Sequence, residues 1–170
     1  MTRDRRQTTS PGLRAAQAAF VVGLLYAAIS VYWAVGGTWL LDTVGASLTQ
    51  AGHGASAGVL FAVWAAAALK IVAAVLPLLA VNPEHAPPGG RGRRVFRVLT
   101  WVEAVILVLY GLVLTVTGLL VQSGLVTAAA NADHRALRWH AYLWDPWFLV
   151  WGLLVTAALL RSRRPAREQA

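Results

Sequence analysis

The chain has 170 residues, of which 58% are hydrophobic and 13% charged, and its formal net charge is +8 at pH 7. This composition excludes a disordered chain and an ordinary soluble domain, and the length fits a single domain. Because the sequence contains no cysteine, it also excludes disulfide, thiolate and iron–sulfur chemistry.

Four apolar runs predict four transmembrane helices, at about residues 15–36, 58–81, 98–121 and 144–160. Three of them are longer than about 20 residues, the length that spans the ~30 Å hydrocarbon core of a bilayer. Short connections join the runs, so we expect an all-α membrane protein, a four-helix up-down-up-down bundle over residues 15–162. Residues 1–14 are expected to form a disordered basic tail, and residues 163–170 a second basic tail.

The first run has polar, aromatic and small residues on one helical face: Gly23, Tyr26, Ser30 and Trp33. Hydroxyl groups need hydrogen-bond partners in lipid, so this face is expected to point into the bundle. Gly36 and Gly37 follow, and glycine is typical of a helix end.

The second run contains a lysine, Lys70, which costs about 2.5–3.5 kcal/mol at a mid-membrane position and is therefore not expected to face lipid. Small residues precede it at a spacing of four: Gly54, Gly58, Ala62 and Ala66. Such a stripe lets helix backbones approach closely, which predicts a contact within the bundle or between subunits. Pro77 lacks an N–H and is expected to kink or loosen the last turns.

The third run carries an acidic residue, Glu103, as the natural partner of Lys70, although about 9 Å of axial offset separates them at 1.5 Å per residue. One alternative is a direct or water-bridged pair, with or without a proton or ion relay. The other pairs Glu103 with Arg97 or Arg94, while carbonyls and Tyr or Ser hydroxyls solvate Lys70. The polar positions predict a bundle interior, either structural or a polar cavity, lined by Tyr26, Ser30, Lys70, Glu103, Tyr110 and Thr117.

The fourth run follows a segment that predicts a short surface helix from about Asp133 to Leu143. Asp145-Pro146 then predicts a helix start, since Asp caps free N–H groups and Pro suits the first helical position. No metal, cofactor or catalytic residue is predicted, because His134 and His140 lack the usual spacing of zinc ligands and no nucleophile motif surrounds any serine.

The arginines gather on one side of the four runs: Arg3, Arg5, Arg6 and Arg14 before the first, Arg91, Arg93, Arg94 and Arg97 between the second and third, and Arg161, Arg163, Arg164 and Arg167 after the fourth. Because Lys and Arg mark the cytoplasmic side, we expect both termini in the cytoplasm and loops 37–57 and 122–143 outside. The expected location is the cytoplasmic (inner) membrane, with anionic lipid headgroups rather than nucleic acid against the basic fringe.

Six of the eight tryptophans fall at the predicted outer face: Trp33, Trp39, Trp139, Trp144, Trp147 and Trp151. Two interpretations remain open. The rings could form an interfacial aromatic belt, or they could line an outer pocket, capped by the two loops, for a lipid or another flat apolar molecule.

Two segments carry a family resemblance: Val31 to Trp39, which contains Tyr-Trp-x-x-Gly-Gly-x-Trp, and Trp144 to Gly152. The chain resembles, over roughly residues 15–162, a domain-of-unknown-function family of small bacterial four-helix membrane proteins with that element after the first helix. The resemblance implies four spans and an inner-membrane location, and it implies no activity.

The function expected from these patterns is a non-enzymatic binding or accessory module with an aromatic outer vestibule for a lipid-like or small apolar ligand. The alternative is a small oligomeric transporter or ion-coupled carrier that uses Lys70 and Glu103, and a third is a lipid-directed enzyme using outer histidines and aspartates. Expected partners are membrane lipids and a second copy or another membrane protein. The candidate site residues are Lys70, Glu103, Tyr26, Ser30, Tyr110, Trp33, Trp39, Trp144 and Asp145.

Overall fold

The computed structural model describes residues 10–45, 57–82 and 90–162. Every regular element in these ranges is helical: α1 (Pro11–Ala34), the 3-10 turn η1 (Leu41–Thr43), α3 (Ala57–Val81), α4 (Gly90–Gln122), α5 (His134–Trp139), the π-helical segment η2 (His140–Trp144) and α6 (Asp145–Arg161). Helices α1, α3, α4 and the continuous stretch His134–Arg161 are long and apolar enough to cross a membrane. The all-α class and the four predicted apolar helices are thus confirmed. Gly54 and most of both predicted tails lie outside the described residues.

The helix ends follow local sequence signals. Ser10 caps α1 by accepting a hydrogen bond from the Leu13 N–H at 3.2 Å, and Gly36 follows the helix with a φ of +95°, a conformation that glycine adopts without strain. Asp133 caps α5 through the N–H groups of Arg135 and Ala136. Asp145 has no capping role, because η2 leads into α6 without a break.

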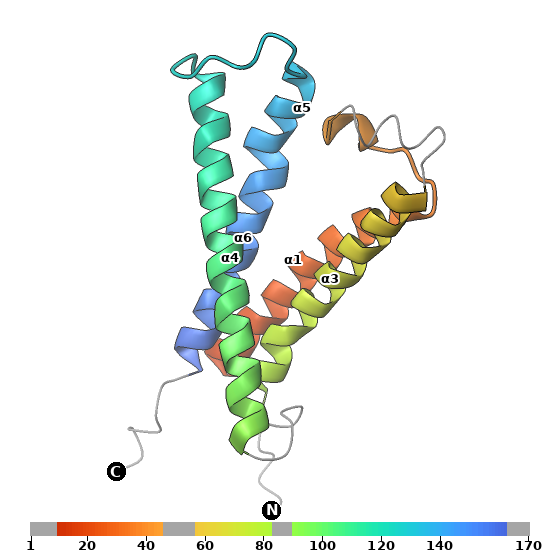
Figure 1. Cartoon of the computed structure of the whole chain (residues 1–170). Helices are drawn as coiled ribbons and strands as arrows, with labels where there is room; N and C mark the ends of the chain where they lie inside the picture. Colours follow the sequence, from red (N-terminus) through yellow and green to blue (C-terminus); the bar gives the residue numbers. More distant parts are fainter. Residues whose placement is uncertain (1–9, 46–56, 83–89, 163–170) are drawn as a thin grey trace, which may run out of the picture.

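The four long helices run up, down, up and down, as predicted, but they do not form a parallel bundle (Figure 1). Helices α1 and α3 form one hairpin, α4 and α6 form the other, and the main contact between the hairpins is α1 against α6. The hairpins meet at one end and diverge toward the other (Figure 1). Lipid is as apolar as a neighbouring helix, so hydropathy alone does not force the apolar faces together.

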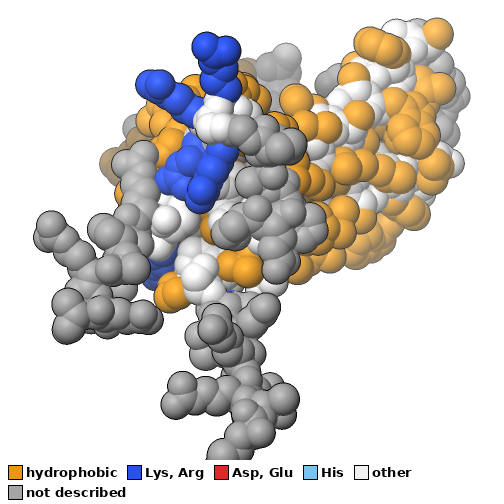
Figure 2. All heavy atoms as spheres, turned by 90° about the horizontal axis from the view of Figure 1, so that it is seen from below, with side chains coloured by type: hydrophobic (Ala, Val, Ile, Leu, Met, Phe, Trp, Pro, Cys, Tyr) orange, Lys and Arg blue, Asp and Glu red, His pale blue; other side chains and the backbone are white. Residues whose placement is uncertain are grey.

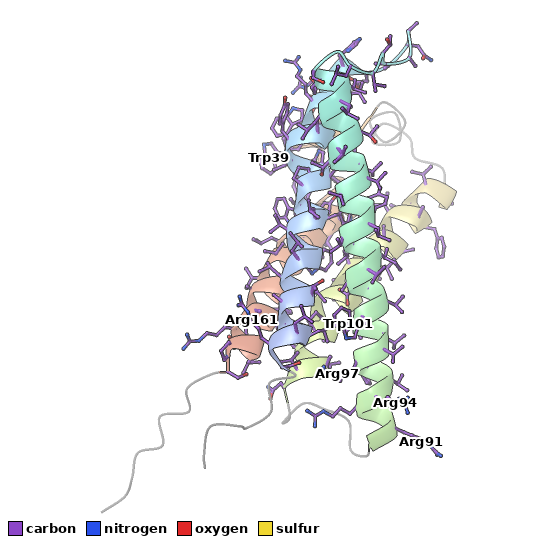
Figure 3. The ribbon with its side chains drawn as sticks, turned by 90° about the vertical axis from the view of Figure 1, so that its left-hand side faces the viewer. Trp39, Arg91, Arg94, Arg97, Trp101 and Arg161 are labelled. Carbon is purple, nitrogen blue, oxygen red and sulfur yellow. The ribbon has the colours of Figure 1, made fainter. Side chains whose placement is uncertain are left out.

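The two ends of the molecule differ in chemistry. At the end where the hairpins meet, the basic side chains gather, as Figure 2 shows from below, and the labels in Figure 3 place Arg91, Arg94, Arg97 and Arg161 there. We call this the arginine end. The opposite end carries Trp39 (Figure 3), η1 and α5, and we call it the aromatic end.

Small residues bring the helices into close contact. A Cβ on Gly23 of α1 would overlap the Trp151 ring of α6 and would lie 2.9 Å from the Ala74 Cβ of α3. A Cβ on Gly111 of α4 would overlap the backbone of α6 at Leu149. The core therefore depends on close backbone approach at these glycines, as is typical of helix packing in membranes.

Candidate functional site

An aromatic cluster at the aromatic end joins α1 to η2 and α6, and Tyr26 lies at its centre. The Tyr26 ring stacks on Trp144 and Trp147, with ring centroids 5.8 and 5.5 Å away, and meets Phe148 edge-on at 4.8 Å. Trp33 meets Trp144 edge-on at 5.6 Å. Ring pairs in this geometry stabilise a packed interface beyond their buried area, by about 0.5–1.5 kcal/mol each.

The indole N–H groups of this cluster bind within the protein. Trp33 Nε1 donates to the Trp39 carbonyl at 2.9 Å, and Trp144 Nε1 donates to Thr43 Oγ1 at 3.1 Å. Trp147 Nε1 donates to the Val22 carbonyl at 3.1 Å. Trp144 is only 1% exposed, so these rings fill the helix contact and do not line a hollow. The candidate residue Trp39 differs, because it is 66% exposed and points away from the helices (Figure 3).

Lys70 reaches across to α1. Its Nζ donates to Ser30 Oγ at 2.7 Å and lies 4.2 Å from the centroid of the Tyr26 ring. Ser30 Oγ in turn donates to the Tyr26 carbonyl at 3.4 Å. The amine is therefore held by a hydroxyl and an aromatic face, as in the second of the two alternatives for Lys70.

Glu103 has neither predicted partner. Both of its carboxylate oxygens are buried and have no hydrogen-bond partner, and it forms no ion pair with Lys70. Arg97 instead donates to Ser162 Oγ at 3.1 Å and to the Leu159 carbonyl at 3.4 Å, which ties α4 to the last turn of α6. Within the described residues, the carboxyl group of Glu103 is thus buried without a hydrogen-bond partner.

Two other polar positions do not line an interior. Tyr110 is 50% exposed, although its ring meets Phe148 edge-on at 5.2 Å, and Thr117 is exposed. The physical reason is the divergence of the hairpins, which leaves this half of α4 without α3 beside it. The small-residue stripe of α3 is exposed for the same reason at Gly58, Ala62 and Ala66, so none of the described helices buries it.

A histidine and an aspartate meet in the π-helical segment. His140 Nδ1 lies 3.1 Å from Asp145 Oδ1, and Asp145 is 4% exposed. The extra residue in a π-helical turn is a recurrent feature of functional sites. Near the same end, Arg135 forms an ion pair of 2.8 Å with Asp42, which ties η1 to α5. Of the outer histidines and aspartates predicted as candidates, the structure joins His140 with Asp145.

An open groove of about 680 Å³ runs along one face of α5 and η2, and the described residues that line it are Arg135, Arg138, Trp139, Tyr142 and Leu143. Trp139 is one of the tryptophans expected at the outer face, whereas Arg135 and Arg138 were not among the candidate site residues. Their spacing of i, i+3, i+4 and i+7 with Trp139 and Tyr142 is the signal that places all four on one helical face.

A smaller groove of about 360 Å³ lies at the arginine end, along α4, and its described lining is Gly90, Arg93, Arg94, Arg97, Val98 and Trp101. Figure 3 shows Arg94, Arg97 and Trp101 at successive levels of that helix. Among the described ranges there is no group of three or more His, Cys, Asp or Glu side chains that could hold a metal ion.

Comparison with protein families finds a match over residues 23–155 to a family model described as "Protein of unknown function (DUF3995)". No curated protein and no solved structure matches the chain. The family match covers α3 and α4, the second half of α1 and most of α6. It confirms the resemblance to a family of unknown function.

Proposed function

The chain belongs to the DUF3995 family of unknown function, and we propose from its geometry that it is an integral membrane protein that binds an amphipathic ligand. The ligand would have an apolar body and an anionic head, and the α5–η2 groove would receive it. The protein acts as a binding or accessory module and not as an enzyme. Its four membrane-capable helices support insertion into the cell membrane.

The orientation is part of the proposal. The arginine end lies in the cytoplasm together with both termini, because Lys and Arg are retained on that side of a membrane. The aromatic end, with the α5–η2 groove, then faces the outside. The arginines at the cytoplasmic face contact anionic lipid headgroups.

The observation that carries the proposal is the lining of the groove. Arg138 offers a planar, permanently charged fork suited to a carboxylate or phosphate. Arg135 is already paired with Asp42, so Arg138 is the guanidinium left to receive an anionic head. Trp139 and Tyr142 provide flat apolar surface beside it, and Tyr142 is 63% exposed.

Two of the residues that line this groove also pack against the aromatic cluster. Trp139 and Leu143 are partly buried against the same core that contains Tyr26 and Trp144. This groove differs from the vestibule expected from Trp33, Trp39 and Trp144, because none of these three is among its described lining residues. A volume of about 680 Å³ is within the range of about 300–1,000 Å³ that small-molecule sites occupy.

Native mass spectrometry in mixed micelles tests the proposal, with short-chain phosphatidylglycerol as the anionic probe and short-chain phosphatidylcholine as the zwitterionic control. The wild-type chain should bind the anionic probe preferentially. Arg138→Gln should weaken that binding by about tenfold to a hundredfold, because a hydrogen bond to a charged group contributes about 1.5–3 kcal/mol.

The matched control is Arg161→Gln, an exposed arginine at the arginine end that lines neither groove; it removes one headgroup contact there and should weaken binding less than Arg138→Gln does. Equal binding of both lipids, or an equal loss in the two variants, would show that the groove does not recognise an anionic head.

A second candidate is a small oligomeric transporter or ion-coupled carrier. The exposed stripe at Gly58, Ala62 and Ala66 favours it, because a second copy could pack there through close backbone contact. Lys70 would then adjoin the interface between subunits. Proton or ion flux into proteoliposomes, compared between the wild type and Lys70→Met, tests this candidate, and equal flux in the two proteins would dismiss it.

A further inference from the structure

Glu103 occupies a place on α4 that no part of the proposed ligand site uses. Both carboxylate oxygens are shielded from solvent and have no hydrogen-bond partner. The charged groups nearest along the neighbouring elements are already engaged: Lys70 of α3 by Ser30, and Arg97 of α4 by Ser162 and the Leu159 carbonyl. Between Asp145 and Arg161, α6 has no titratable side chain.

The register of α3 against α4 follows from a contact one turn from Glu103. Thr100 Oγ1 lies 3.5 Å from the carbonyl oxygen of Leu76. The two helices are antiparallel, so three residues forward on α4 correspond to three residues back on α3. Glu103 therefore lies at the level of Ala73, and it shares with Thr100 the face that an i, i+3 spacing defines.

The carbonyl of Ala73 lacks its usual hydrogen-bond donor within α3. In an α-helix this carbonyl would accept the N–H of the residue four positions on, but that residue is Pro77, which has none. The helix nevertheless continues through Pro77 to Val81, and Pro77 is buried. Where proline interrupts a membrane helix, side chains of neighbouring helices supply the missing donor.

Only one form of Glu103 can be that donor. An ionised carboxylate accepts hydrogen bonds and cannot donate, whereas the protonated acid has one O–H to give. An unpaired carboxylate buried in apolar surroundings is also strongly disfavoured. A buried acid on α4 thus lies at the level of an α3 carbonyl that has lost its helical donor, and a protonated carboxyl group is the form that could donate to it.

We propose that Glu103 is an intramembrane proton-binding site, whose neutral carboxylic acid donates to the Ala73 carbonyl left without a donor by Pro77. Removal of the proton would leave a buried charge facing a carbonyl oxygen and would loosen α3 from α4. This site is independent of the ligand groove at the aromatic end, and its ligand is a proton.

Infrared spectroscopy of the full chain in phosphatidylcholine vesicles tests the protonation state directly. Glutamate labelled with ¹³C at the carboxyl group marks three residues, Glu84, Glu103 and Glu168. At pH 7 the wild type should show a labelled band of an un-ionised acid, and Glu103→Gln should remove it. Gln supplies an N–H donor of the same size, so this variant keeps its fold. A wild-type spectrum with labelled carboxylate bands alone would overturn the proposal.

The partner of the acid is tested by Pro77→Ala, which gives the Ala73 carbonyl a helical N–H donor. The infrared band of the un-ionised acid should then shift toward the position of a carboxylic acid without a hydrogen-bond acceptor. As the pH is raised, this band should also be lost at a lower pH than in the wild type, because the protonated form has lost its hydrogen bond. Pro146→Ala, on α6, is the matched control and should leave the band unchanged. An acid band that does not respond to Pro77→Ala would show that Ala73 is not the acceptor.

Discussion

Helix α3 lies in two different surroundings along its length. Toward the arginine end its Ala74, Pro77 and Ala80 are buried against the neighbouring helices, whereas toward the aromatic end its Phe61 is 75% exposed and Trp64 is 45% exposed. The half of α3 near the arginine end is held by small residues that let the helix backbones approach. The half near the aromatic end has no helix on its exposed side. Both halves of α3 are rich in apolar residues, so close packing, rather than apolar character, distinguishes the contacts.

The aromatic end is held in another way. There α1 meets η2 and α6 through large rings centred on Tyr26 and Trp144, and the indole donors bind carbonyl or hydroxyl oxygens. Substitutions that shorten a side chain should therefore lower the stability most at the aromatic end, whereas substitutions that enlarge a side chain should lower it most at the arginine end.

Trp144→Ala should have the largest effect, because it removes a side chain that is fully buried among rings and leaves the Thr43 hydroxyl without its donor. We expect a loss of about 3–5 kcal/mol in the free energy of unfolding, measured by SDS titration in mixed micelles with circular dichroism. Trp39→Ala is the control, since Trp39 is exposed and contributes its backbone carbonyl to the Trp33 bond. Similar losses in both variants would contradict a packed cluster.

Ala74→Leu tests the arginine end by adding atoms. Ala74 is fully buried against Gly23, so the larger side chain should cost about 1–3 kcal/mol in the same titration. Ala62→Leu makes the same change at an exposed position of the same helix and should change stability by less than about 0.5 kcal/mol. If Ala62→Leu were the more damaging change, the exposed stripe would be an interface in the membrane.

Ser30→Ala tests the boundary between the two halves, where Lys70 reaches α1. The amine would lose its hydroxyl acceptor but keep the Tyr26 ring, so we expect a loss of about 0.6–1.7 kcal/mol in the free energy of unfolding. Ser30→Thr, which keeps the hydroxyl, should retain most of that stability. A variant Ser30→Ala with unchanged stability would show that the Tyr26 ring suffices to hold the amine.

Asp42→Asn should have the smallest effect. The Arg135–Asp42 pair is exposed, so its loss should change stability by about 0.2–1 kcal/mol, and high salt should reduce the difference between variant and wild type. The same variant frees Arg135 and should strengthen binding of the anionic probe to the α5–η2 groove. Weaker binding in this variant would argue against the groove as the anion site.

Much of the helical architecture was predictable, and the way the helices pair was not. Long apolar runs predict the helices, and Gly36 predicts the end of the first, because both signals are local. The start of α4 at Gly90 was missed by eight residues, since Arg91 to Arg97 end the apolar run without ending the helix. Apolar character also does not distinguish a face that meets lipid from one that meets a helix, so the divergence of the hairpins was not foreseen.

The candidate site shows the same limit. The cost of a lysine in lipid predicted that Lys70 points into a helix contact, and its Nζ lies against Ser30 Oγ and the Tyr26 ring of α1. The rotation of α3 about its own axis decides that Lys70 points to Ser30 and not to Glu103, and no local signal reports that rotation. The helical donor that Pro77 lacks was visible in the sequence, but the level of Glu103 relative to Ala73 was not, because it follows from the contact of Thr100 with the Leu76 carbonyl.

The divergence of the two hairpins also has a mechanical meaning. A molecule whose helices meet at one end and separate at the other is wedge-shaped, so in a bilayer it would take up more area in one leaflet than in the other (Figure 1). At the wider end the Trp144–Thr43 hydrogen bond and the Arg135–Asp42 ion pair still join the two hairpins, so a change in the area of that leaflet would act on these contacts first. With the proposed membrane insertion, the angle between the hairpins would couple this protein to the curvature of the bilayer.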